Sequence, residues 1–184
     1  MQPQNWVFVG IVVVAIILII WAVARQRRSA ALRKRFGPEY ERTVREQGSG
    51  RAESVLAERE KRVEKYPVRT LRVDEREHFI TEWRVLQSQF VDDPGGTVTK
   101  ADALVRQIME ARGYPVSNFE QRAADLSVDH PRVVDNYRAA HEIALRHERG
   151  MATTEDLRNA IIYYRTLFDE LLQTKPITGE SQVA

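Results

Sequence analysis

The chain has 184 residues, a formal net charge of +2 and no cysteine. The absence of cysteine excludes disulfides, thiolate metal sites and cysteine nucleophiles. Residues 25–35 carry six positive charges and residues 1–24 carry none, so subtracting six from +2 leaves −4 for residues 36–184. A nucleic-acid-binding body would have a basic face of its own. The mildly acidic body therefore predicts no nucleic-acid partner.

An apolar run extends over residues 6–24, after a short N-terminal tail at residues 1–5. These 19 residues contain no charge, and as an α-helix they would reach about 28 Å, close to the thickness of a bilayer core. Trp6 and Trp21 lie near its two ends, where tryptophan favours the membrane interface. A soluble helix that is apolar on every side would need a large core around it. The run therefore predicts a single N-terminal transmembrane helix in a lipid bilayer.

A basic juxtamembrane segment, residues 25–36, follows the apolar run. Its cationic residues are Arg25, Arg27, Arg28, Arg33, Lys34 and Arg35. By the positive-inside rule, this charge asymmetry predicts an N-terminus outside and a C-terminal body in the cytoplasm. The same side chains are placed to meet anionic lipid headgroups, or else they only fix the topology. A body outside the membrane, or a cleaved signal peptide with a secreted body, is the alternative.

Residues 37–73 are rich in charge and poor in apolar side chains. Seven acidic and eight basic residues fall between positions 39 and 69, with Val55, Leu56 and Val63 as the few docking points. This composition favours a charged, largely solvated helical stalk and linker, with a break at residues 47–50. A coiled-coil segment is the alternative, but the apolar a and d positions that it needs over three or four heptads are missing.

Apolar residues spaced by three and four predict a helical bundle domain over residues 74–174. Helices are expected at 74–91 and 97–112 and from about 117, 131 and 153. Their predicted start signals are an N-cap at Asp74, capping boxes at Ser117–Glu120 and Thr153–Asp156, and Pro131 at a first helical position. No strand pattern occurs outside short linkers. The predicted fold class is thus all-α, with a transmembrane helix, a charged helical stalk and an antiparallel helical bundle, and residues 175–184 are a disordered tail.

No catalytic or metal-binding motif is found in the chain. His141-Glu142 begins like the helix of a zinc protease, but Leu145 stands where the second histidine is needed. The glycines before Lys100 lack the spacing of a phosphate-binding loop. The sequence therefore predicts no catalytic residue, no metal ligand and no cofactor.

The most distinctive stretch of the body is residues 119–131, where charges surround a tight turn between helices. Its candidate partner or ligand surface consists of Arg122, Asp125, Asp129 and His130. The competing interpretation is an elbow in which the first three of these tie a short helix to its neighbour. The less favoured enzyme alternative would require Arg122, Asp129, His130 and His141 to meet in one cleft.

Six segments together carry a resemblance to known proteins. They are Arg35–Tyr40, Glu82–Arg84, Phe90–Pro94, Arg112–Pro115, Phe119–Pro131 and Asn136–His141. They resemble a group of uncharacterised bacterial single-pass membrane proteins, some described as secreted, over about residues 32–172. The resemblance implies a bacterial inner-membrane protein with a helical body. Because the group has no assigned activity, it implies no functional residue.

The function predicted from these observations is that of a membrane-anchored helical interaction or scaffold protein with an unknown protein partner, and not of an enzyme. A flat amphipathic surface of the bundle would take a partner helix. A sensor of anionic lipid acting through residues 25–35 is a further alternative.

Overall fold

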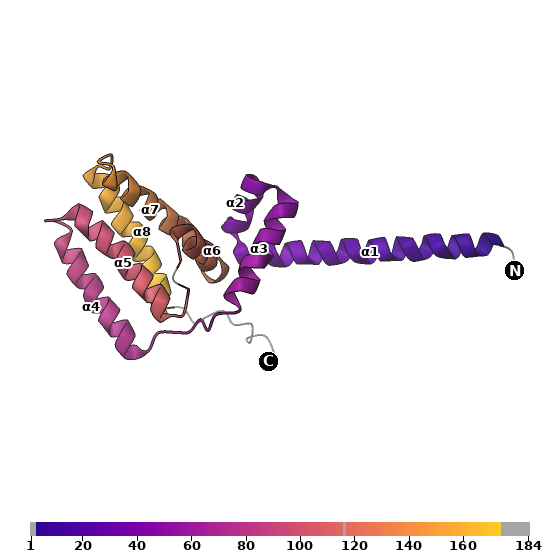
Figure 1. Cartoon of the computed structure of the whole chain (residues 1–184), viewed down its shortest axis with the longest axis horizontal. Helices are drawn as coiled ribbons and strands as arrows, with labels where there is room; N and C mark the ends of the chain where they lie inside the picture. The colour runs from indigo at the N-terminus through magenta and orange to yellow at the C-terminus, as the bar shows by residue number, and fades with distance from the viewer. Residues whose placement is uncertain (1–2, 116, 174–184) are drawn as a thin grey trace. The chain divides into compact units, whose positions relative to one another are not determined.

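A computed structural model describes residues 3–115 and 117–173, with side chains described from Val13 onward, and contains eight helices and no strand within these residues. The helices are α1 (Pro3–Phe36), α2 (Pro38–Gln47), α3 (Ser49–Val63), α4 (Val73–Gln89), α5 (Pro94–Ala111), α6 (Phe119–Asp129), α7 (Val134–Glu148) and α8 (Thr154–Gln173) (Figure 1). The predicted all-α class is therefore confirmed for the described chain. The tail predicted at 175–184 lies outside the described residues.

The chain divides into two compact units, Met1–Leu56 and Ala57–Ala184. The division falls within α3, so the second unit takes in the end of α3 and the linker that follows it. Both segments belong to residues 37–73, which were predicted to form the stalk and linker.

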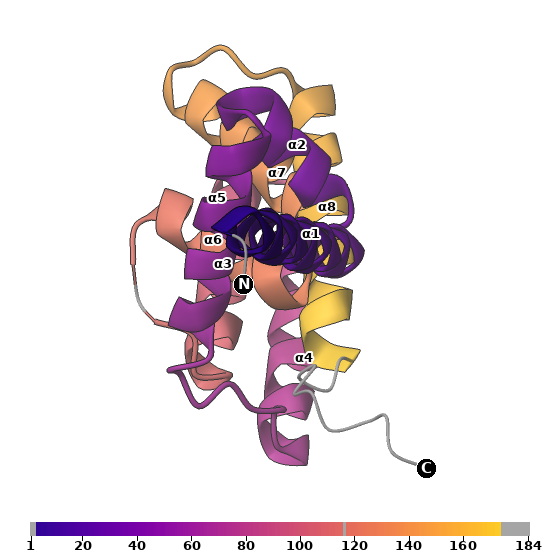
Figure 2. The ribbon, with the colours of Figure 1, turned by 90° about the vertical axis from the view of Figure 1, so that its right-hand side faces the viewer.

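The first unit consists of α1, α2 and the first half of α3. α1 runs without a break from Pro3 to Phe36 and is seen nearly end-on in Figure 2. Its last two turns bury Leu32 and Phe36, and α1 packs against α2. Glu39 and Thr43 of α2 are also buried, so this part of the predicted stalk is not solvated. The reason is that α2 presents one face to its neighbours, whereas charge content alone does not show which face is covered.

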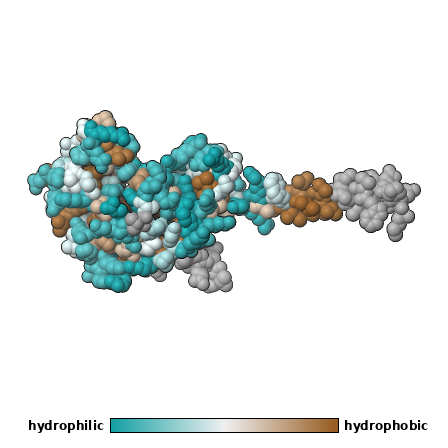
Figure 3. All heavy atoms as spheres, in the orientation of Figure 1, coloured by the Kyte–Doolittle hydropathy of each residue, from teal (hydrophilic) through white to brown (hydrophobic). Residues whose placement is uncertain are grey.

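The apolar part of α1 is exposed wherever its side chains are described. The residues from Ile16 to Trp21 are between 49% and 63% exposed. Because they are consecutive, they cover every side of the helix, and they appear as the brown stretch of Figure 3. Among the described residues, no helix combines the length and the apolar character that a membrane crossing requires. This finding does not bear out the transmembrane helix predicted at 6–24, which stays a prediction.

The second unit is a helical bundle centred on α8. α8 packs against α7 and α5, α4 covers α5, and α6 packs against α7. The buried side chains that form this core recur every three or four residues along each helix. They include Phe79, Trp83, Leu104, Ile108, Met109, Leu126, Tyr137, Tyr164, Leu167, Phe168 and Leu171.

Two helix starts differ from their predicted positions because local capping groups act earlier in the chain. α5 begins at Pro94, three residues before the predicted start, since the Asp93 carboxylate accepts a hydrogen bond from the Gly96 N–H at 2.8 Å. Proline at the first helical position needs no N–H partner. α4 begins at Val73, and the N–H of Arg72 donates to Glu75 at 2.9 Å. Asp74 is therefore a first-turn residue and not the N-cap.

Two later starts differ in the opposite direction, and a third is confirmed. α6 is capped by Asn118, whose side chain accepts from the Gln121 N–H at 2.9 Å, and not by Ser117. α7 begins at Val134 because residues 131–133 form a turn after α6. The predicted capping box at the start of α8 is confirmed: the Asp156 carboxylate accepts from the Thr153 N–H at 2.9 Å, and the Thr153 hydroxyl accepts from the Asp156 N–H at 3.1 Å.

Candidate functional site

The four candidate residues of the 119–131 stretch lie in α6 or directly after it. Arg122 and Asp125 stand on α6, Asp129 is its last residue and His130 is its C-cap. Arg122, Asp125 and His130 are buried, while Asp129 is half-buried. Their side chains enter three different clusters.

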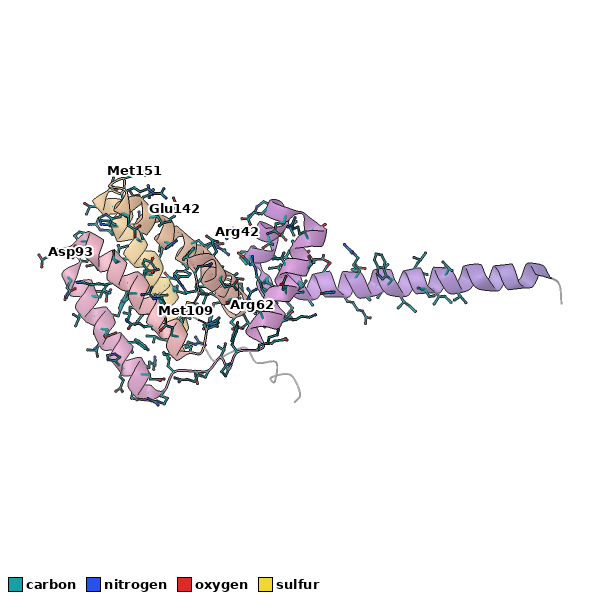
Figure 4. The ribbon with its side chains drawn as sticks, in the orientation of Figure 1. Arg42, Arg62, Asp93, Met109, Glu142 and Met151 are labelled. Carbon is teal, nitrogen blue, oxygen red and sulfur yellow. The ribbon has the colours of Figure 1, made fainter. Side chains whose placement is uncertain are left out.

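Asp125 pairs with Arg62, which lies at the end of α3. Arg62 is labelled in Figure 4. The Arg62 Nε and Nη2 atoms both donate to Asp125 Oδ1, at 2.8 and 2.7 Å. Gln121 donates to the same oxygen at 2.8 Å. The other oxygen, Oδ2, is buried and has no hydrogen-bond partner among the described residues. The Asp125 side chain is fully buried. Its ion pair with Arg62 ties α6 to α3 within the second unit.

Arg122 belongs to an aromatic cluster between α6 and α7. Its Nε donates to the Tyr137 hydroxyl at 3.1 Å, and its Nη1 donates to the Ser117 carbonyl at 2.5 Å. Its guanidinium also lies 6.0 Å from the ring of Phe119, within the range of a cation–π contact. Phe119 stacks on His141 with ring centroids 3.6 Å apart. The cluster thus brings together two of the four enzyme candidates, Arg122 and His141.

Burial controls the titration of this aromatic cluster. It raises the pKa of Tyr137 to about 12, with the nearby Asp102 carboxylate adding to the shift. It also raises the pKa of Tyr164, whose hydroxyl donates to Asp102 at 3.1 Å. Burial lowers the pKa of His141, which keeps its ring neutral against the face of Phe119. These groups are held in their neutral forms by desolvation.

His130 belongs to a buried polar network around Arg112, the residue that follows α5. Arg112 Nη1 donates to the Leu171 carbonyl at 2.9 Å and lies 3.5 Å from His130 Nε2. His130 Nδ1 lies 3.2 Å from Glu170 Oε1. A neutral imidazole with its proton on Nδ1 satisfies both contacts, because Nε2 then accepts from Arg112 and Nδ1 donates to Glu170. Burial lowers the pKa of His130 and outweighs the hydrogen bond to Glu170, which raises it; the Arg112 charge adds to the lowering.

Asp129 lies next to this network and accepts a hydrogen bond from the Tyr114 hydroxyl at 2.8 Å. Its negative charge raises the pKa of Tyr114 together with burial, which is the larger cause. Asp129 and Glu170 also balance the Arg112 charge electrostatically, although burial lowers the pKa of that guanidinium. The buried Arg112 cation thus lies near two carboxylates, Asp129 and Glu170, both of which are partly exposed.

Sequence reasoning missed Arg112 and Glu170 as members of this network. Arg112 stands directly before a helix-ending glycine, where a basic side chain is ordinarily read as a partner of the helix dipole. Nothing in its local pattern signals full burial. The enzyme interpretation placed His130 and His141 in one cleft, but His130 contacts Arg112 and Glu170, whereas His141 stacks on Phe119. Within the described residues, no group of three or more His, Asp or Glu side chains is placed to hold a metal ion.

The basic juxtamembrane segment forms the end of α1. Arg25, Arg27, Arg28 and Lys34 are exposed. The Arg25 guanidinium lies 5.7 Å from the ring of Trp21. Arg33 is exposed as well but pairs with Glu41 of α2 at 2.6 Å, so its charge is partly compensated by the protein. Arg35 is half-buried.

Two hollows line the sides of α4. The larger, of about 520 Å³, lies between α4 and α5, and its lining includes His78, Glu82, Val85, Lys100 and Leu104. The smaller, of about 290 Å³, lies between α4 and α8, where Trp83 stacks on Phe168 with ring centroids 4.7 Å apart. Neither hollow is lined by a residue of the 119–131 stretch.

No family model, no curated protein and no solved structure matches the chain. The predicted similarity to bacterial single-pass membrane proteins stays a prediction.

Proposed function

We propose that the protein is a membrane-anchored helical interaction or scaffold protein of the bacterial inner membrane, with the apolar run at residues 6–24 inserted in the bilayer and the helical bundle in the cytoplasm. The observation that carries the proposal is the exposure of consecutive apolar side chains from Ile16 to Trp21 on every side of α1. Such a surface needs an apolar environment around the whole helix and not along one stripe.

The free energy involved favours a bilayer over water for this surface. Nine large apolar side chains between Val13 and Val23 are at least 43% exposed. Fully burying an aliphatic side chain contributes about 1.5 to 3 kcal/mol, so transfer of these residues contributes on the order of 10 kcal/mol. A single partner protein would cover only one side of the helix.

The basic residues at the end of α1 support the orientation. Arg25, Arg27 and Arg28 directly follow the apolar run and are exposed, where each contributes about 1 kcal/mol near an anionic membrane surface. Trp21, next to Arg25 in the structure, suits the interface between acyl chains and headgroups. Arg33 contributes less to the lipid contact because Glu41 already pairs with it.

Membrane insertion is tested by alkaline extraction of membranes that contain the full chain. We expect the natural chain to stay in the membrane pellet. Replacing Ile17 and Ile19 with lysine should release it, because each charge at the centre of a membrane helix costs about 3 kcal/mol. The double variant I161K/I162K, which adds the same charge to α8, is the control and should stay in the pellet. Release of the natural chain under the same conditions would contradict the anchor.

The side of the membrane is tested with a reporter fused after Ala184 that is active only in the cytoplasm. We expect an active reporter in the natural chain and a loss of activity in part of the molecules when Arg25, Arg27 and Arg28 are replaced with glutamine. An inactive reporter in the natural chain would contradict the cytoplasmic body and favour the envelope-facing alternative.

A further inference from the structure

The hollow between α4 and α5 has an apolar floor and a charge of opposite sign at each end. Val85, Leu86 and Leu104 supply apolar lining, and Val85 is 53% exposed. A mainly apolar hollow of about 520 Å³ between two helices is a surface on which another helix can lie.

The order of residues along the hollow follows from the connection between the two helices. α4 and α5 are joined by residues 90–93 and pack against each other, so they run antiparallel. The Lys100 ammonium donates to Gln89 at 2.8 Å, near the connecting turn. Glu82 lies about two turns before Gln89 on α4, away from the connecting turn, and contacts His78 at 3.3 Å. Val85 stands between the basic and the acidic end.

We propose that this hollow is a self-association surface, in which a second copy of the chain lies antiparallel across it with Val85 near a two-fold axis. In a two-fold interface each copy presents the same patch, so a residue near the axis faces its own counterpart. Glu82 then meets Lys100 of the second copy, and Lys100 meets Glu82 of the second copy. The two ends of the hollow thus pair reciprocally, and the exposed Val85 side chains cover each other.

The hollow on the other side of α4 does not have this property. It is lined by Arg76, Arg84 and Arg165, with Asp169 as the acidic residue. Pairing of this surface with its own copy would bring an excess of positive charge together, which disfavours association. The arrangement of charge therefore selects the α4–α5 side for a second copy. This inference concerns the helical bundle and does not depend on the membrane anchor.

The absence of cysteine from the chain allows a direct test by crosslinking. Val85→Cys places a single thiol near the expected axis, and a short-arm bismaleimide should link two copies of the purified full chain in detergent micelles. Ile162→Cys is the matched control, because Ile162 lies on α8 and its side chain is 52% exposed. This variant should stay monomeric on a denaturing gel. Absence of the Val85→Cys dimer, or equal crosslinking at both sites, would overturn the proposal.

Charge reversal tests the reciprocal pairing in the Val85→Cys background. We expect Glu82→Lys or Lys100→Glu alone to lower the dimer affinity about tenfold or more, because each change places like charges together at both ends. The double variant E82K/K100E restores unlike pairs and should recover the crosslink. If neither single reversal reduces the crosslink, or if the double variant does not recover it, the antiparallel arrangement is wrong.

Discussion

Arg62 and Asp125 form an ion pair that ties α6 to α3, with two nitrogens of the guanidinium on one carboxylate oxygen at 2.7 and 2.8 Å. Asp125 is fully buried, whereas the Arg62 side chain keeps 30% of its exposure. The two partners therefore depend on the pair to different degrees. Without Arg62, the buried Asp125 carboxylate loses the cation that pairs with it, but without Asp125, the Arg62 guanidinium still reaches water.

We predict that Arg62→Ala lowers the free energy of unfolding by about 3 kcal/mol, because it leaves a buried charge uncompensated. Asp125→Ala should cost less, and the double variant should cost less than the sum of the two, since the pair acts as a unit. Urea unfolding of the full chain in micelles, followed by helical circular dichroism, measures all three. An equal cost for both single variants would contradict the asymmetry.

Gly113 is predicted to be far less tolerant of alanine than Gly150. Both have positive φ angles, 91° and 71°, which cost a non-glycine residue about 1 kcal/mol. A Cβ on Gly113 would also lie 2.7 Å from the carbonyl oxygen of Pro67, whereas Gly150 has open space. We expect Gly113→Ala to cost about 2 to 4 kcal/mol and Gly150→Ala about 1 kcal/mol in the same unfolding measurement. Similar costs would show that the linker yields at Pro67.

The stability of the protein should fall when the solution is acidified below pH 6.5, in part because of His130. Burial holds the pKa of folded His130 below its ordinary value of 6.5, so the unfolded chain takes up a proton first. The contribution of this group is fully present above pH 6.5 and is lost as the pH falls towards the folded pKa, with a slope of up to about 1.4 kcal/mol per pH unit.

His130→Gln should remove part of this slope, because glutamine does not titrate. The unfolding free energy at pH 8 separates any cost of altered packing from the titration, since His130 is neutral in both states there. An unchanged slope in the variant would contradict the buried neutral histidine. His141→Gln should remove a further part, since burial lowers the pKa of His141 as well.

Tyr164→Phe should cost about 1 kcal/mol at neutral pH, because Asp102 loses the hydroxyl that donates to it at 3.1 Å. Burial raises the pKa of Tyr164 above its ordinary value of 10.0. The stabilisation linked to this proton is therefore present below pH 10 and lost as the pH rises above it. The variant should lose less stability between neutral and alkaline pH than the natural chain does. Tyr163→Phe, which removes the hydroxyl at the neighbouring position, is the control for the stability that Tyr164→Phe loses at neutral pH.

Local features of the fold could be predicted from the sequence because they depend on neighbouring residues. The capping box of Thr153 and Asp156 is fixed by a spacing of three residues. The break at Gly48 follows from the backbone preferences of glycine. The predicted start at Pro131 was wrong because the chain first completes a turn at the end of α6, which competes locally with an early helix start.

The candidate site could be predicted only as a stretch of sequence. The 119–131 region does contain buried charged residues, but the residues that contact them come from distant parts of the chain. Arg62 reaches Asp125 across 63 residues, and Arg112 reaches the Leu171 carbonyl across 59. No periodic pattern links such positions.

The sequence by itself determined the all-α class, most helix boundaries within a few residues and the asymmetric charge after the apolar run, because helix formation and net charge are local or additive properties. Only the tertiary structure decided that Arg112 is buried beside His130, that Asp125 pairs with Arg62 and that α4 and α5 leave an apolar hollow with opposite charges at its ends. These features depend on which helix faces pack together, and packing selects one arrangement among many that share the same pattern of apolar residues.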